Sequence, residues 1–222
     1  MSVVTLETVK KVPDIDVYVA NANDYLGASG YTEHGLRHAN LVASIARQVL
    51  ARLGFSEREA ELAAIAGYMH DIGNVAGRYM HGQTGAVMAW DLLRDLGMAS
   101  DEVAKIIAAI GNHDPEDIGI AVNNVAAALI LADKSDVHKS RVRNTDVATF
   151  DIHDRVNHAA QHSFLRVDDR KRTITLELAI DTSISPVMDY FEIFLTRMVM
   201  CRRAAGFLKC SFELKINEVR LL

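Results

Sequence analysis

Apolar side chains recur every three to four residues along most of the first two-thirds of the chain. This spacing is typical of amphipathic helices, and no proline interrupts it between Pro13 and Pro115. Glycine follows three of the periodic segments, at Gly54, Gly73 and Gly97, and we expect it to end each of them. The pattern predicts helices at 14–28, 32–53, 56–72, 83–96, 100–113, 121–138 and 150–162.

The pattern changes to strict alternation after about residue 163. In Thr173–Asp181 apolar and polar residues alternate, which predicts a strand with one buried face. The expected elements of this part are a hairpin at 164–167 and 173–181, an amphipathic helix opened by Pro186, and a last strand around 212–216. We therefore predict a mainly α protein: a helical domain at 1–163 and a small α+β (ββαβ) layer of unknown function at 164–222.

The composition argues against several classes of protein. Half of the 222 residues are hydrophobic and 24% are charged, which is typical of a globular chain and excludes a disordered one. The formal net charge of −5 gives no support for bulk binding of nucleic acid or of an anionic membrane. The longest apolar run, 125–132, is too short to span a bilayer, and the first residues contain no apolar signal region. Only Cys201 and Cys210 are present, so we expect a reduced, cytoplasmic protein without a disulfide framework.

Histidine is the unusual residue type in this sequence. His38 begins an apolar stripe that continues through Val42 and Ile45, so we expect it to face the core. One such histidine alone is explained by a hydrogen bond to a backbone carbonyl. The chain has nine histidines, however, and the stretch 34–81 holds four of them: His34, His38, His70 and His81.

Acidic and imidazole groups also end other apolar faces. His70 and Asp71 follow one apolar stripe, Asp133 ends the most apolar segment of the chain, and His113 ends another stripe. Lys134 lies about 100° further around its helix, so we do not expect it to pair with Asp133. Buried groups of this kind are costly unless they are compensated. A divalent metal would compensate them, because imidazole and carboxylate ligands suit several transition metals.

These residues resemble the H…HD…D pattern of the HD superfamily of metal-dependent phosphohydrolases. The segment 68–73 is similar to the HDIG signature of that family, and 131–134 is similar to its terminal aspartate helix. Two further segments, 81–86 and 110–114, resemble the intermediate histidine motifs of some members. The resemblance implies the metal ligands His38, His70, Asp71 and Asp133, with His81 and His113 as candidate ligands of a second ion.

The resemblance also implies an all-helical domain that hydrolyses phosphate esters or anhydrides, often of nucleotides, with metal-activated water. One or two divalent transition metals are expected, with Fe, Mn, Co, Ni and Zn all compatible. Asp71, as a bridging or proton-accepting carboxylate, and Lys134, as a phosphate-binding cation, are the expected catalytic residues. The candidate substrate-binding residues are His34, Arg78, Lys134, His138 and Arg141.

Two other functions stay open at this point. A di-iron oxygenase would use the same six ligands, and a non-catalytic module would use the metal only for stability. In the second case the exposed strand edges of 164–222 could pair with another copy and form a homodimer. The sequence lacks the Gly-x-Ser-x-Gly turn of serine hydrolases and the glycine-rich phosphate loops. It determines neither the substrate, nor the metal, nor the oligomeric state.

Overall fold

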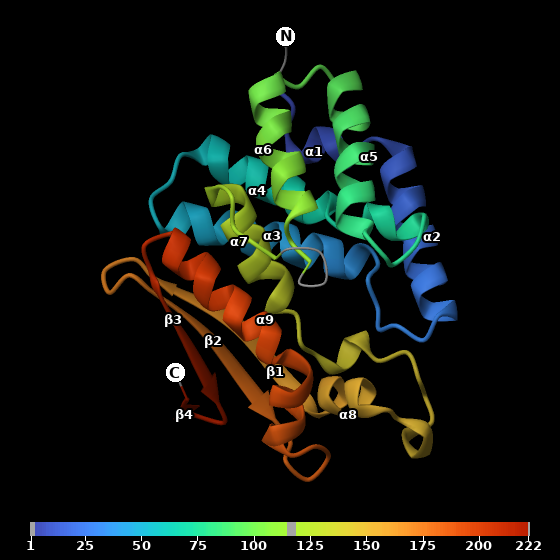
Figure 1. The fold of residues 1–222 in the computed structure, drawn as a ribbon, viewed down its shortest axis with the longest axis vertical. Coiled ribbons are helices and arrows are strands. Elements are labelled where there is room, and N and C mark those ends of the chain that lie inside the picture. The colour runs from blue at the N-terminus through green and yellow to red at the C-terminus, as the bar shows by residue number, and fades with distance from the viewer. Residues whose placement is uncertain (1–2, 115–118, 222) are drawn as a thin grey trace.

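The computed structural model describes residues 3–114 and 119–221. Helices make up the N-terminal two-thirds, and a four-stranded sheet with one long helix makes up the rest (Figure 1), so the predicted fold class is confirmed. The elements are α1 (Leu6–Val9), α2 (Pro13–Ala28), α3 (Leu36–Arg52), α4 (Glu57–Met69), η1 (Ile72–Val75), α5 (His81–Asp95), α6 (Ser100–Gly111), α7 (Asn124–Lys134), η2 (Lys139–Arg141), η3 (Val147–Thr149), α8 (Ile152–Ala159), β1 (Ala160–Asp168), β2 (Thr173–Ile180), α9 (Val187–Phe207), β3 (Ser211–Ile216) and β4 (Val219–Arg220).

Helices α3, α4 and α7 pack against one another and form the centre of the helical part. The segments 62–69 of α4 and 125–132 of α7 are buried throughout, which agrees with their nearly continuous apolar sequence. A Cβ atom at Gly67 would lie 2.8 Å from the backbone nitrogen of Ala43, so the missing side chain allows α4 to approach α3 closely. Helix α3, which carries His38, therefore lies in direct contact with α4, which leads into His70 and Asp71.

The sheet has the strand order β1-β2-β3-β4, with β2 and β3 parallel and the outer pairs antiparallel. Every second residue of β2 is buried, from Ile174 to Ile180, as the alternation predicts. Helix α9 connects the parallel strands and packs on α7 as well as on β3 and β2. It thus lies between the sheet and the helical part (Figure 1). The division into two domains at residue 163 stays a prediction.

Several helices are shorter than the periodicity predicts, because they begin later or end earlier. The segment 32–53 becomes helical only at Leu36, because Gly35 before it has extended backbone angles. The segment 121–138 is helical only from Asn124 to Lys134. The segment 150–162 gives way at Ala160 to β1, which therefore starts before the predicted 164. After α7 the helical pattern continues because the irregular residues Ser135, Asp136 and Val137 are also buried.

Glycines end two helices as predicted, and the third glycine has another role. Gly54 and Gly97 have φ angles of 82° and 78°, the left-handed conformation that glycine adopts without strain. The prediction that Gly73 ends a helix is wrong, since α4 already ends at Met69 and Gly73 lies inside η1. A Cβ atom at Gly73 would collide with the carbonyl oxygen of His81 and with the backbone of Gly85. Gly73 is therefore needed for the close contact between η1 and α5.

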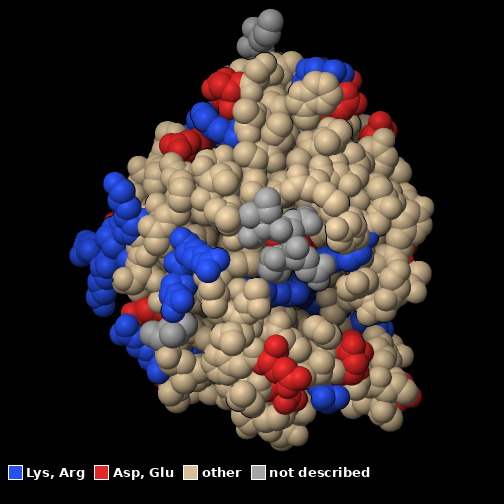
Figure 2. Space-filling model, in the orientation of Figure 1, with Lys and Arg blue, Asp and Glu red and all other residues tan. Residues whose placement is uncertain are grey.

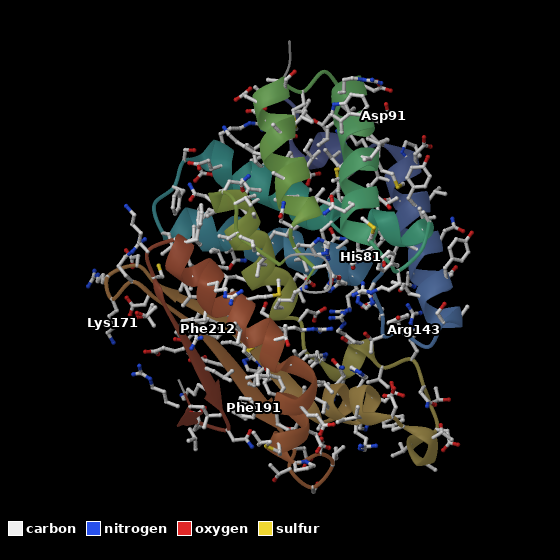
Figure 3. All side chains as sticks on the ribbon, viewed as in Figure 1. His81, Asp91, Arg143, Lys171, Phe191 and Phe212 are labelled. Atoms are coloured by element: carbon white, nitrogen blue, oxygen red, sulfur yellow. The ribbon has the colours of Figure 1, made fainter. Side chains whose placement is uncertain are left out.

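The described residues contain no helix that is long and apolar enough to cross a lipid bilayer. Basic side chains gather on one side of the molecule, over the turn between β1 and β2 (Figure 2), where the sequence reads Arg170-Lys171-Arg172. Figure 3 places Lys171 at the outer edge of the sheet and His81 in the middle of the molecule, so this charged turn is remote from the predicted ligands.

Candidate metal centre

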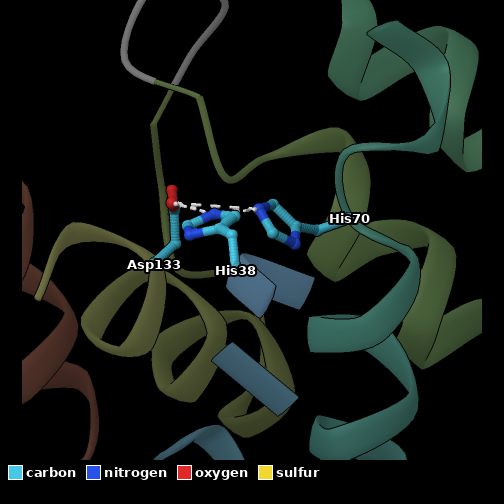
Figure 4. A group of neighbouring side chains, drawn as sticks. All are labelled: His38, His70 and Asp133. Carbon is cyan, nitrogen blue, oxygen red and sulfur yellow. Dashed lines mark hydrogen bonds and ion pairs between the residues drawn. The ribbon is translucent and has the colours of Figure 1, made fainter. Parts of the chain in front are cut away.

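Four predicted ligands from three helices meet at one point in the core. His38 comes from α3, His70 and Asp71 follow the end of α4, and Asp133 comes from α7. Figure 4 shows three of these side chains, His38, His70 and Asp133. The Nε2 atom of His38 lies 3.2 Å from Nε2 of His70 and 3.4 Å from Oδ1 of Asp133. The Nε2 atom of His70 lies 3.3 Å from Oδ2 of Asp71. Nitrogen and oxygen atoms with metal-ligating chemistry thus converge in a buried cluster.

A second cluster adjoins the first through Asp71. His81 at the start of α5 and His113 after α6 bring their Nε2 atoms to 3.2 Å from each other. Oδ1 of Asp71 lies 3.4 Å from Nε2 of His81, and Oδ2 of Asp114 lies 3.3 Å from the same nitrogen. The two oxygens of Asp71 therefore face different histidine pairs. One oxygen of Asp71 is thus available to each histidine pair.

The protonation of the four rings follows from their outer nitrogens. Each Nδ1 atom lies beside an oxygen acceptor, so each neutral ring carries its proton on Nδ1 and has a lone pair on Nε2. The Nδ1 contacts are to Asp136 Oδ2 (2.7 Å) for His38, Gly67 O (2.8 Å) for His70, Arg78 O (3.0 Å) for His81 and Ile110 O (2.6 Å) for His113.

The two pairs of Nε2 atoms at 3.2 Å need either a shared proton or a metal ion between or beside them, because two lone pairs at this distance repel each other. Oδ2 of Asp71 is also buried, and it has no hydrogen-bond partner among the described residues. A buried carboxylate oxygen without a donor is costly, and metal coordination removes that cost. The residues present therefore fit one or two divalent ions, with the Nδ1 hydrogen bonds orienting the imidazole ligands.

The charge states of Asp71, Asp133 and His113 suit metal binding, whereas contacts with Asp133 and Asp136 outweigh burial and raise the pKa of His38. Burial acts to raise the pKa values of Asp71 and Asp133, but the neighbouring cation and imidazoles outweigh it and hold both pKa values well below the usual range. For Asp133 the largest of these opposing effects comes from Lys134. Burial, followed by the neighbouring histidines, lowers the pKa of His113 to about 3. Both carboxylates are thus ionised and His113 is neutral at pH 7, as ligands must be.

The prediction for Lys134 is wrong in one respect: its ammonium group pairs with Asp133. The helix ends at Lys134, and the flexible four-carbon side chain folds back over the last turn, which the angular position of its Cα does not reveal. Lys134 is buried and lines the cavity above the two clusters. It is therefore in position to contact a group bound at the centre.

The structure brings most of the predicted substrate-binding residues to this cavity. His34, Arg78, Lys134 and Arg141 line it together with Asp71. His34 precedes α3 instead of forming its first turn, and its ring centre lies 5.4 Å from that of His38. His138 is not among the side chains that line the cavity, and its Nδ1 atom bonds to the backbone nitrogen of Ser140.

Three residues near the centre are absent from the sequence-based predictions: Asp114, Asp136 and Arg197. Asp136 lay inside a predicted helix that in fact ends two residues before it. Asp114 directly follows His113, as Asp71 follows His70, and this repeated His-Asp pair was a usable signal. Arg197 lies three residues after Phe194 and four before Cys201, so it belongs to the same buried stripe of α9. An arginine on a buried stripe is a signal of the same kind as His38.

Comparison with known proteins agrees with this arrangement. The HD domain family model matches residues 31–156, which include all six predicted ligands. An uncharacterized protein of Methanocaldococcus jannaschii is 27% identical to this chain over 139 residues, and the alignment covers 53% of each protein. The chain thus spans about half the length of the curated relative it matches.

Proposed function

The chain belongs to the HD domain family, and we propose that its buried centre hydrolyses a phosphate ester or anhydride of a small molecule, with nucleotides as one substrate class. The observation that carries this proposal is the position of Asp71, whose two oxygens face the pair His38 and His70 and the pair His81 and His113. A carboxylate shared between two imidazole pairs, under a cavity lined by cations, suits attack of water on a phosphoryl group.

The metal ligands in this proposal are the residues of the two clusters. His38, His70, Asp71 and Asp133 would hold one divalent ion, and Asp71, His81 and His113 would hold a second. Bound metal would lower the pKa of a coordinated water and polarise a phosphoryl oxygen. Fe, Mn, Co, Ni and Zn all accept this donor set, so the metal identity is left to measurement.

The cations around the cavity would bind and orient the phosphate. Lys134 and Arg78 line the cavity and carry donors that suit phosphoryl oxygens. His34 donates from Nδ1 to the carbonyl of Thr32 at 2.7 Å, which leaves a lone pair on Nε2. Burial, followed by the charge of Arg141, lowers the pKa of His34 well below its usual range. A neutral His34 would accept a hydrogen bond from water or from the substrate.

The deciding experiment measures metal content and hydrolysis on the same preparations. Elemental mass spectrometry of untagged protein is expected to find one or two transition-metal ions per chain, and a panel of phosphate esters and anhydrides is expected to include a substrate. The H70A and D71A variants should lose both metal and activity while keeping the helical circular dichroism signal. H162A, which removes an exposed histidine of β1, is the matched control. Full hydrolysis by H70A would overturn the proposal, and substrate-dependent oxygen uptake by an iron-loaded protein would favour an oxygenase.

A further inference from the structure

Arg197 brings a positive charge from the C-terminal layer to the candidate metal centre. Helix α9 packs on α7, and Arg197 lines the cavity above the centre together with Asp71 and Asp133. Its guanidinium carbon lies 4.7 Å from the centre of the Phe194 ring, and this cation–π contact orients the group. Both residues lie outside the segment 31–156 that matches the HD family model. The metal-binding family domain therefore does not supply this charge.

The other cations of the cavity each have a carboxylate partner. The pairs are Lys134 with Asp133, Arg78 with Asp114 and Arg141 with Asp136. Arg197, by contrast, forms no ion pair and donates no hydrogen bond to any residue that the structure describes. Burial lowers the pKa of its guanidinium, but arginine stays charged at neutral pH. Arg197 is partly buried, and a partly buried cation without a carboxylate is stabilised by an anion that enters the cavity.

A second cavity, of about 270 Å³, adjoins the first. His34, Arg78, Arg141 and Arg197 line both cavities, so the two spaces share one wall. Unlike the first cavity, the second is also lined at its α8 end by Asp151, Asp154 and Asn157. Two carboxylates at that end repel a second phosphate, but they accept hydrogen bonds from hydroxyl or amino groups. Cations thus line both cavities, whereas Asp151 and Asp154, here called the acidic end, line only the second.

We infer that Arg197 binds the phosphate of a phosphomonoester whose other end carries hydroxyl or amino groups and lies against Asp151 and Asp154. This inference rests on the proposed function and narrows its substrate class, because it disfavours molecules with phosphates at both ends. The HD segment would supply the metal ligands, and α9 would supply the residue that selects for a phosphate near them. Arg197 is in this sense a specificity residue and not a metal ligand.

The first test measures binding of inorganic phosphate to the metal-loaded protein by calorimetry. R197M, which keeps an unbranched side chain over Phe194, is expected to weaken phosphate binding at least about tenfold, since one charge-assisted hydrogen-bonding group is lost. R197K should lose less, and R203M, on an exposed position of the same helix, should bind as the wild type does. Thermal melts establish that each variant is folded, and R197Q replaces R197M if the latter does not fold.

Equal phosphate affinity in R197M and the wild type would overturn the inference, as would a wild-type protein that binds no phosphate. Binding is read here without turnover. A protein that binds phosphate through Arg197 and hydrolyses no ester would therefore contradict the proposed function alone.

The second test compares two phosphonates, whose C–P bonds a phosphohydrolase does not cleave. The wild type is expected to bind the phosphonate analogue of a hexose 6-phosphate at least about tenfold more tightly than methylphosphonate, because the hydroxyl groups reach the acidic end. D154N should reduce this preference, while D169N should keep it, since Asp169 lies two residues before Lys171, which Figure 3 places on the remote turn. Equal binding of the two phosphonates by the wild type, or an unchanged preference in D154N, would overturn the assignment of the acidic end.

Discussion

Asp136 accepts a hydrogen bond from Nδ1 of His38 at 2.7 Å, and both side chains are buried. The same carboxylate receives Arg37 at 2.8 Å, so it is held from two sides. Burial acts to raise the pKa of Asp136, but the hydrogen bond from His38 and the nearby arginines outweigh it. The pKa of Asp136 therefore lies far below its usual range, and the carboxylate is ionised. Asp136 thus fixes the tautomer and the orientation of a proposed metal ligand without contacting the ion.

The D136N variant is expected to weaken metal binding by about 10–100-fold, because the amide oxygen accepts a weaker hydrogen bond from Nδ1 of His38 than the charged carboxylate does. Competitive titration with a coloured chelator measures this affinity. D146N is the control, since Asp146 caps the exposed segment η3. Unchanged metal affinity in D136N would show that the backbone alone orients His38.

The G73A variant is expected to destabilise the fold by about 2 kcal/mol or more, because the added methyl group overlaps with the backbone of His81 and Gly85, which cannot move aside like a flexible side chain. Urea unfolding measures the difference in free energy. G206A is the matched control: its added methyl group meets nothing within 4 Å, and it should be neutral or stabilising by up to about 1 kcal/mol. Equal stability of G73A and the wild type would contradict the packing described for η1.

The H81A variant is expected to bind about one metal ion per chain where the wild type binds about two, because His81 belongs to the second cluster only. Elemental mass spectrometry after reconstitution gives the ratio. The rate of hydrolysis should fall because the second ion is lost, whereas the helical circular dichroism signal should not change. Loss of both ions in H81A would mean that the two clusters bind as one unit.

Arg58 and Glu102 make the stability of the protein depend on pH. Nε of Arg58 lies 2.6 Å from Oε1 of Glu102, and Nη1 bonds to the carbonyl of Val4, so the pair links α4, α6 and the N-terminal segment. The hydrogen bond from Arg58 lowers the pKa of Glu102. The carboxylate therefore contributes stability above its unfolded pKa and loses it as the pH falls through the folded pKa.

The E102Q variant should be less stable than the wild type at pH 7, by about 0.5–1 kcal/mol, and the difference should shrink once the pH falls below the unfolded pKa of about 4.3 and vanish below the lower folded pKa. Urea unfolding at several pH values measures it. E57Q is the control, because Glu57 lies on the surface with 83% of its side chain exposed, and its pair with Arg47 should contribute nothing measurable. A constant difference between E102Q and the wild type across this pH range would exclude a role for the charge.

Apolar periodicity predicted the helical part well because burial of one face determines the spacing of side chains. Its failures come from residues that are buried in irregular backbone. Asp136 is such a residue: the packed turn after α7 continues the helical pattern without being a helix. The same pattern correctly placed His38 on a buried face, since that residue lies inside α3.

The predicted ligands come together as the family resemblance implies, but the resemblance contains no information on Arg197. That residue reaches the cavity only through the packing of α9 on α7, a contact between segments far apart in the sequence. A single sequence specifies such a contact only through the sum of many small packing energies. The ion pair between Lys134 and Asp133 is likewise not predictable from the sequence, because the position of a residue on a helix does not determine the direction of a flexible side chain.

The position of α9 between the sheet and α7 also has a consequence for biosynthesis. All six proposed ligands precede residue 134, whereas Arg197 and the rest of α9 are translated later. Domains of nascent chains fold in the order in which they leave the ribosome. The helices that carry the ligands can therefore assemble first and take up metal from an open surface, and α9 then closes over the centre as the last major helix to emerge.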